Sequence, residues 1–210
     1  MKRILIVGAG GQIGSELTTY LRKIYGASNV VATDVRECGK LAEGGPFEVL
    51  NALDAKAMAS VVERYKIDAI FNLVALLSAV GEKNPQTAWN INIGALMNAL
   101  EVAREYGCAL FTPSSIGAFG PTSPKDKTPQ DTIMQPTTIY GVCKVTGELL
   151  GNYYFQRYGV DTRSVRFPGI ISNVTLPGGG TTDYAVEIYY EAIKAGRFTC
   201  TVPGDVYMDM

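Results

Sequence analysis

The strongest constraint on the fold is a glycine-rich turn between the first apolar run and the first helical pattern. Residues 4–7 read Ile-Leu-Ile-Val, which is typical of a strand buried on both faces of a parallel sheet. Residues 8–14 follow as Gly-Ala-Gly-Gly-Gln-Ile-Gly, and apolar residues then recur at helical spacing up to Ile24. This strand, turn and helix predict the first unit of a doubly wound sheet.

Strand and helix patterns alternate along the rest of the chain. We expect strands at 30–34, 47–50, 69–75, 109–115 (ending in Ser114-Ser115) and 162–167, and helices at 55–65, 87–106, 139–158 and 183–195. Four prolines exclude regular structure from 120–138, which we expect to be an exposed loop. The alternation predicts an α/β fold, a Rossmann-type doubly wound parallel sheet with helices on both faces.

The composition narrows the chemistry. The 210 residues contain no histidine, so acid–base catalysis must use Tyr, Lys, Ser, Thr or carboxylates. The four cysteines lie far apart without a Cys-x-x-Cys pair, and we expect no metal site. A net charge of −1 argues against a nucleic-acid partner, and the apolar runs are too short for a membrane span or a signal peptide. We therefore expect a cytoplasmic protein.

The glycine turn suits a dinucleotide. Gly8 allows a tight turn, Gly11 lets backbone approach a pyrophosphate, and Gly14 allows close packing of helix on strand. Asp34 follows Gly14 by twenty residues, where a carboxylate accepts hydrogen bonds from ribose hydroxyls and repels a 2′-phosphate. NAD is therefore favoured over NADP, although Arg36 keeps NADP open. The residues predicted to contact NAD here are Gly8, Gly10, Gly11, Gln12, Ile13, Gly14, Asp34, Arg36, Leu53 and Asp54, and Asp54 is equally suited to cap the following helix.

A Tyr-x-x-x-Lys pair supplies a candidate base. Tyr140 and Lys144 open the helix that follows the fifth strand and its Ser115, so these groups should converge at the carboxyl edge of the sheet. A neighbouring ammonium lowers a phenol's pKa, as a bound nicotinamide cation would. A second pair, Tyr190 and Lys194, lies inside a later helix and is interpreted as surface decoration.

Taken together, these motifs resemble the extended type of the short-chain dehydrogenase/reductase superfamily. The matching positions, in order over residues 1–170, are Gly8, Gly11, Gly14, Asp34, Asp54, Asn72 to Ala75, Asn92, Ser115, Tyr140 and Lys144. Within that superfamily, the stretches 76–82, 113–120 and 178–186 are similar to NAD-dependent L-threonine 3-dehydrogenases.

The resemblance implies oxidation of L-threonine to 2-amino-3-oxobutyrate, with reduction of NAD. It implies that Tyr140 removes the hydroxyl proton, Lys144 holds the nicotinamide ribose, and Ser115 binds the reacting oxygen. It further implies cofactor contacts by Leu73, Ala75, Phe167 and Ile170, and substrate contacts by Ser78, Ser114, Ser115, Tyr140, Thr181 and Thr182.

Larger-scale organisation is also implied by the resemblance. Extended members continue beyond residue 210, so we expect an NAD-binding domain at 1–170 and, at 171–210, an incomplete part of a smaller substrate-binding domain. The helices at 87–106 and 139–158 resemble those that pair in family homodimers. Two alternatives stay open: a nucleotide-sugar epimerase or dehydratase, which shares these motifs, and a non-catalytic dinucleotide sensor, which usually lacks the full Ser/Tyr/Lys set.

Overall fold

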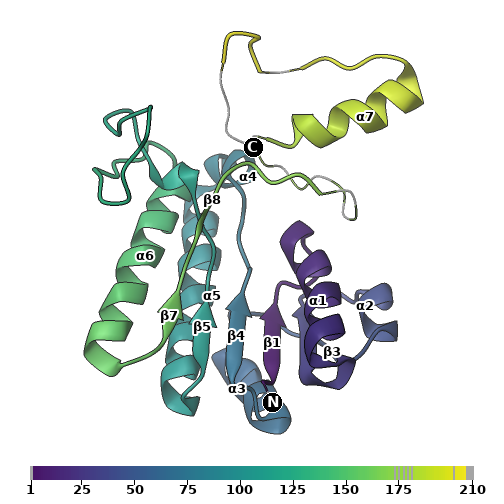
Figure 1. Ribbon diagram of the computed structural model, residues 1–210, viewed down its shortest axis with the longest axis vertical. Helices are drawn as coiled ribbons and strands as arrows, with labels where there is room; N and C mark the ends of the chain where they lie inside the picture. Colours follow the sequence, from purple (N-terminus) through teal and green to yellow (C-terminus); the bar gives the residue numbers. More distant parts are fainter. Residues whose placement is uncertain are drawn as a thin grey trace.

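The computed structural model describes residues 2–172, 174, 176, 178, 180, 182–200 and 202–206. Within them, six strands form one parallel sheet in the order β3-β2-β1-β4-β5-β7 (Figure 1). The strands are β1 Ile4–Val7, β2 Val30–Asp34, β3 Phe47–Val49, β4 Ala69–Asn72, β5 Ala109–Phe111 and β7 Thr162–Arg163. The strand order reverses between β1 and β4, and ligands bind at such a reversal, beyond the carboxyl ends of the strands.

Helices cover both faces of this sheet, which confirms the doubly wound α/β fold. α1 (Gln12–Tyr25) and α2 (Gly39–Glu43) pack on one face, and α3 (Ala55–Tyr65), α5 (Pro85–Tyr106) and α6 (Ile139–Tyr158) on the other. Two further helices, α4 (Ser78–Lys83) and α7 (Tyr184–Ala195), lie toward the carboxyl edge (Figure 1). In the described residues, no helix combines the length and apolar character needed to cross a bilayer.

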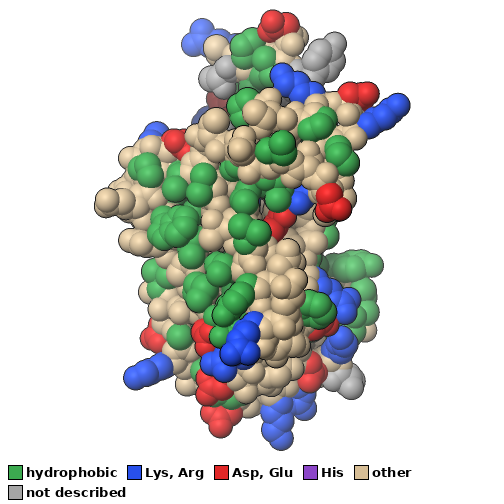
Figure 2. Space-filling model, turned by 90° about the vertical axis from the view of Figure 1, so that its left-hand side faces the viewer, with side chains coloured by type: hydrophobic (Ala, Val, Ile, Leu, Met, Phe, Trp, Pro, Cys, Tyr) green, Lys and Arg blue, Asp and Glu red, His purple; other side chains and the backbone are tan. Residues whose placement is uncertain are grey.

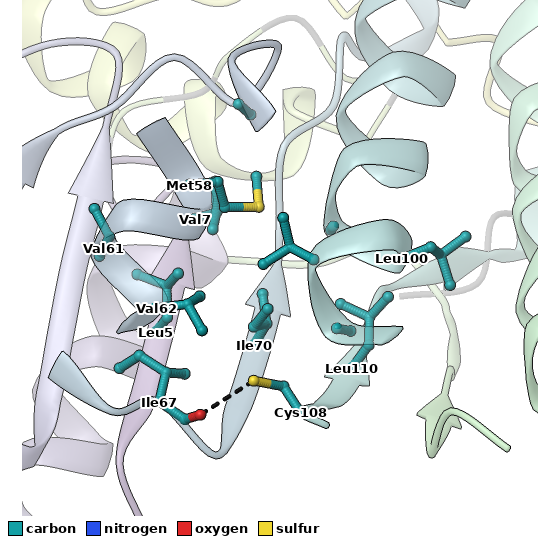
Figure 3. Packing of buried hydrophobic residues seen from close by; sticks show 14 of the residues in the cluster. Leu5, Val7, Met58, Val61, Val62, Ile67, Ile70, Leu100, Cys108 and Leu110 are labelled. Atoms are coloured by element: carbon teal, nitrogen blue, oxygen red, sulfur yellow. Dashed lines mark hydrogen bonds between the residues drawn. The ribbon is translucent and has the colours of Figure 1, made fainter. Parts of the chain in front are cut away.

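The core lies between the central strands and the helices on each face. Leu5 of β1 belongs to the cluster with Met58 of α3, Ile70 of β4 and Leu110 of β5 (Figure 3). Ile6 belongs to the opposite cluster, with α1. All five side chains are at most 2% exposed, and burying each stabilises the fold by about 1.5–3 kcal/mol. This packing fixes the strand ends from which the site is built.

Three of the predicted strands differ in extent from the observed ones. The strand predicted at 69–75 stops at Asn72, and the one at 162–167 splits into β7 and β8 (Arg166–Phe167). Ser114–Ser115 do not extend the fifth strand: they form β6, which pairs with β8 in a separate sheet. The hydrogen bonds to the neighbouring chain nevertheless continue, since the Ser114 N–H donates one of 2.9 Å to the Val165 carbonyl oxygen. Pro113 has no N–H to offer on the opposite side, toward β4. The helices at 55–65 and 139–158 occur as predicted, and the loop 120–138 contains no helix or strand.

Candidate active site

A cleft of about 450 Å³ opens at the carboxyl edge of the sheet. It is bordered by the start of α1, the chain after β4, residues 113–119, the first turns of α6, and the segment after β8. The predicted site residues that line it are Gln12, Ile13, Leu73, Ala75, Ser78, Ser114, Ser115, Tyr140, Lys144, Phe167, Ile170 and Thr182. The lining does not include the other residues predicted to contact NAD, which are Gly8, Gly10, Gly11, Gly14, Asp34, Arg36, Leu53 and Asp54. Thr181 lies outside the described residues.

The glycine turn has the geometry that a pyrophosphate requires. Gly8 has a φ of 85°, a conformation that favours glycine. A Cβ on Gly14 would lie 2.3 Å from the Gly8 carbonyl oxygen, so only glycine lets α1 approach β1 this closely. No side chain caps α1 and its first turn holds no acidic residue, which leaves its N–H groups and positive helix end to an anion. These observations fit a dinucleotide.

Asp34 lies against this turn, as predicted. Its Oδ2 accepts a hydrogen bond of 2.9 Å from the Gly10 N–H, and its Oδ1 accepts one of 3.3 Å from the Arg36 N–H. A Cβ on Gly10 would meet Asp34 Oδ2 at 3.0 Å and Cys38 Sγ at 2.7 Å, so glycine is needed for the contact. The carboxylate keeps lone pairs for ribose hydroxyls, which fits an adenosine without a 2′-phosphate.

The role of Asp54 as a helix cap is confirmed. Its Oδ1 accepts a hydrogen bond of 2.9 Å from the Ala57 N–H in the first turn of α3. Its neighbour Leu53 packs against α5: a Cβ added to Gly94 would lie 3.0 Å from Leu53 Cδ2. Contact of Leu53 and Asp54 with the adenine stays a prediction.

The first turn of α6 is held tightly, and this places Tyr140. Thr138 caps the helix by accepting a hydrogen bond of 3.1 Å from the Gly141 N–H, and Glu82 of α4 accepts one of 2.7 Å from the Ile139 N–H. Gly141 packs against the short 3₁₀ turn η2 (Ile116–Ala118): a Cβ there would lie only 2.2 Å from the Gly117 carbonyl oxygen. Because Gly141 has no side chain, α6 comes close enough for Tyr140 to reach the segment that carries Ser115.

Ser115, Tyr140 and Lys144 converge in the cleft. Tyr140 lies beside Ser115: a Cβ added to Gly117 would lie 3.3 Å from the Tyr140 ring and 3.4 Å from Ser115 Oγ. Lys144 Nζ donates a hydrogen bond of 2.7 Å to the Pro113 carbonyl oxygen and lies 5.2 Å from the centre of the Tyr140 ring. A phenol, a hydroxyl and an amine thus face one space beside the glycine turn, an arrangement that can bind an alcohol and move its proton.

The predicted direction of the Tyr140 pKa is wrong for the free protein. Burial raises the pKa of the phenol above its ordinary value, and the Ser115 side chain lowers it only in part. Burial likewise lowers the pKa of Lys144 to about 8. Both changes have one cause, because a buried site disfavours the charged form of each group. Burial of the phenol thus sets the direction, and the amine 5.2 Å from its ring centre does not reverse it.

Ser114 binds a carboxylate that the sequence did not indicate. Its hydroxyl is buried and donates a hydrogen bond of 2.5 Å to Glu148 Oε1, and its contact with a substrate stays a prediction. Glu148, which is further bound by Arg166, was missed. Its spacing of four residues from Lys144, itself four from Tyr140, is the signal that places it on the same face of α6. Tyr190 of the second pair is 44% exposed on α7, outside the lining of the cleft.

Comparison with known proteins places this geometry in context. The model of the NAD dependent epimerase/dehydratase family matches residues 4–208. An uncharacterized epimerase/dehydratase of Staphylococcus haemolyticus is 60% identical, over 100% of this chain and 67% of that protein. The L-threonine dehydrogenase from Clostridium difficile has a TM-score of 0.90 at 56% identity, covering 95% of this chain and 63% of that one. The holo form of the GalE-like L-threonine dehydrogenase from Cupriavidus necator has a TM-score of 0.92 at 51% identity, covering 97% and 66%. The chain thus spans about two thirds of the length of these relatives.

Replacing Lys144 by Met is expected to remove a pH-dependent part of the stability. The pKa of Lys144 is about 8 in the folded state against an ordinary value of 10.5, so between these values the unfolded chain binds more protons. The wild type should therefore gain stability relative to Lys144→Met as the pH rises from about 8 to 10.5, by on the order of 3 kcal/mol. Urea unfolding of both proteins from pH 7 to 10.5 measures this effect. A difference in the free energy of unfolding that stays constant over that range would contradict a Lys144 pKa lowered by burial.

Proposed function

This chain belongs to the NAD dependent epimerase/dehydratase family, and from that premise we propose that it oxidises L-threonine to 2-amino-3-oxobutyrate with NAD as its cofactor. The observation that carries the proposal is the convergence of Ser115, Tyr140 and Lys144 in one cleft beside the glycine turn. The substrate is supported by the two structures at 56% and 51% identity, both of which are L-threonine dehydrogenases.

The three side chains divide the work of moving a proton. Tyr140 accepts the proton of the substrate alcohol at its phenol oxygen, and Ser115 orients the reacting oxygen by a hydrogen bond. Lys144, cationic below about pH 8, favours the phenolate and holds a ribose hydroxyl. When bound, NAD supplies the ring that accepts the hydride and a positive charge near the phenol. The glycine turn and Asp34 would hold its pyrophosphate and adenosine ribose, and Leu73, Ala75, Phe167 and Ile170, which line the cleft, would contact its nicotinamide half.

The substrate side of the cleft is assigned to small hydroxyl residues. Ser78 of α4 and Thr182, just before α7, line the cleft from opposite segments. Hydroxyl groups both donate and accept hydrogen bonds, so they suit a small zwitterion with a carboxylate and an ammonium. We assign residues 1–170 to cofactor binding and residues 171–210, with Thr181, to part of the substrate-binding domain. A cytoplasmic location stays a prediction.

A direct assay of NADH formation distinguishes this function from its alternatives. The purified protein is incubated with NAD and either L-threonine or a nucleotide sugar, and the absorbance of NADH is followed. We expect NADH to accumulate only with L-threonine. Interconversion of the sugar without net NADH would instead identify an epimerase, and NAD binding without turnover of either compound would identify a sensor.

Replacing Tyr140 by Phe tests the assigned base. The variant keeps the ring but loses the proton acceptor, so kcat for L-threonine should fall by about 10²–10⁴-fold, while the dissociation constant for NADH stays within about twofold. Tyr190→Phe is the matched control, because Tyr190 has the same Tyr-x-x-x-Lys spacing outside the cleft. Full activity of Tyr140→Phe, or equal losses in both variants, would refute the assignment.

We also propose that the chain forms a homodimer through α5 and α6. One face of α6 carries Val142, Leu149 and Tyr153, each 39–61% exposed. Figure 2 shows the side of the molecule where α6 lies. Hydrophobic side chains gather over the middle of this side, and most of the charged side chains lie toward its upper and lower ends. Light scattering after size exclusion should give twice the mass of the chain, and Leu149→Glu should give the monomer. A monomeric wild type at micromolar concentration would exclude the dimer.

A further inference from the structure

A partly buried ion pair lies next to Ser114 of the cleft. Glu148 of α6 receives two hydrogen bonds from Arg166 of β8, at 2.9 Å from Nε to Oε1 and at 2.8 Å from Nη2 to Oε2. Each of the two side chains is only 15% exposed. Ser114 donates its hydroxyl proton to the same carboxylate. The roles proposed for Ser115, Tyr140 and Lys144 do not account for this network.

The network joins α6 to both strands of the small sheet. Ser114 of β6 and Arg166 of β8 are register partners, and Ser115 is paired in the same way with Phe167. Each strand has only two residues, so few ladder hydrogen bonds hold them together. The Glu148 carboxylate binds one residue of each strand and thereby fixes the strands to each other and to α6.

Three α6 side chains, one turn apart, lie next to three consecutive residues of the chain after β5. Tyr140 lies beside Ser115, Lys144 donates to the Pro113 carbonyl oxygen, and Glu148 accepts from Ser114. Glu148 is the last of the three, and its partner Arg166 is itself restrained. Arg166 donates a hydrogen bond of 2.9 Å to the Gln130 carbonyl oxygen and lies 5.3 Å from the centre of the Phe119 ring.

We infer that Glu148 and Arg166 are positioning residues for the cleft. Their ion pair holds Ser115 beside Tyr140 and keeps Phe167 in the lining of the cleft. The consequence for turnover rests on the proposed oxidation, whereas the consequence for the order of residues 113–119 and 164–170 does not. Small displacements of reacting groups slow catalysis strongly, so loss of the pair should lower kcat more than it weakens cofactor binding.

Glu148→Gln tests this inference, because it keeps the shape and one accepting oxygen but removes the charge. We expect kcat for L-threonine to fall by about 10–100-fold and the dissociation constant for NADH to change by less than about threefold. Hydrogen exchange of the NAD-bound protein should accelerate in peptides covering 113–119 and 164–170, and not in β1, β2 or β4. Asp161→Asn is the control, since it removes an ion pair with Arg163 that is 51–76% exposed, and it should change neither readout.

The double variant Glu148→Gln with Arg166→Met separates positioning from stability. Glu148→Gln leaves the Arg166 guanidinium without its carboxylate partner, and Arg166→Met removes that unpaired charge. The melting temperature of the double variant should therefore return toward that of the wild type, while kcat and the fast exchange should not recover. Recovery of kcat together with stability would overturn the inference, as would unchanged exchange at 113–119 in Glu148→Gln. If the wild type does not oxidise L-threonine, the proposed function fails, and the exchange readout still decides the role of the pair.

Discussion

The site depends on the grip of one helix face on residues 113–115. β5 ends at Phe111, and the chain beyond it passes into the small sheet, where the Ser114 N–H donates a hydrogen bond to the Val165 carbonyl oxygen. From α6, Lys144 binds the Pro113 carbonyl oxygen, Glu148 binds the Ser114 hydroxyl, and Tyr140 lies beside Ser115. Gly141 makes the grip possible, since any side chain there would collide with the Gly117 carbonyl oxygen. A helix seated this closely brings its first polar residues to the carboxyl edge of the sheet, beside the glycine turn.

The electrostatic state of the free site follows from its burial. The pKa of the Tyr140 phenol is raised and that of the Lys144 amine is lowered to about 8, so each group favours its neutral form more than it would in water. A base that acts near neutral pH needs the opposite change in the phenol. The positive charge of a bound oxidised dinucleotide would supply it. The free protein is thus arranged so that cofactor binding, and not the lysine alone, makes the phenol acidic.

Much of this was predictable from the sequence, and the exceptions have physical reasons. The glycine turn, Asp34 and the limits of α6 could be read because glycine, proline and capping residues act locally. The hydrogen bond of the Ser114 hydroxyl could not be predicted, since its acceptor, the Glu148 carboxylate, lies 34 residues away in the sequence. The sign of the Tyr140 pKa change was mispredicted, because spacing shows that an amine is near but not how deeply both groups are buried. Glu148 had the right spacing, yet a charged residue on a helix usually faces solvent.

The central claim is that α6 presents Tyr140 and Lys144 to the nicotinamide half of the cofactor. A crystal structure of the protein with bound NAD tests it most directly. We expect Lys144 Nζ at about 3 Å from a hydroxyl of the nicotinamide ribose, with the Tyr140 oxygen facing the reactive carbon of the ring. A nicotinamide bound away from Tyr140, or a Lys144 that remains on the Pro113 carbonyl without touching the ribose, would contradict it.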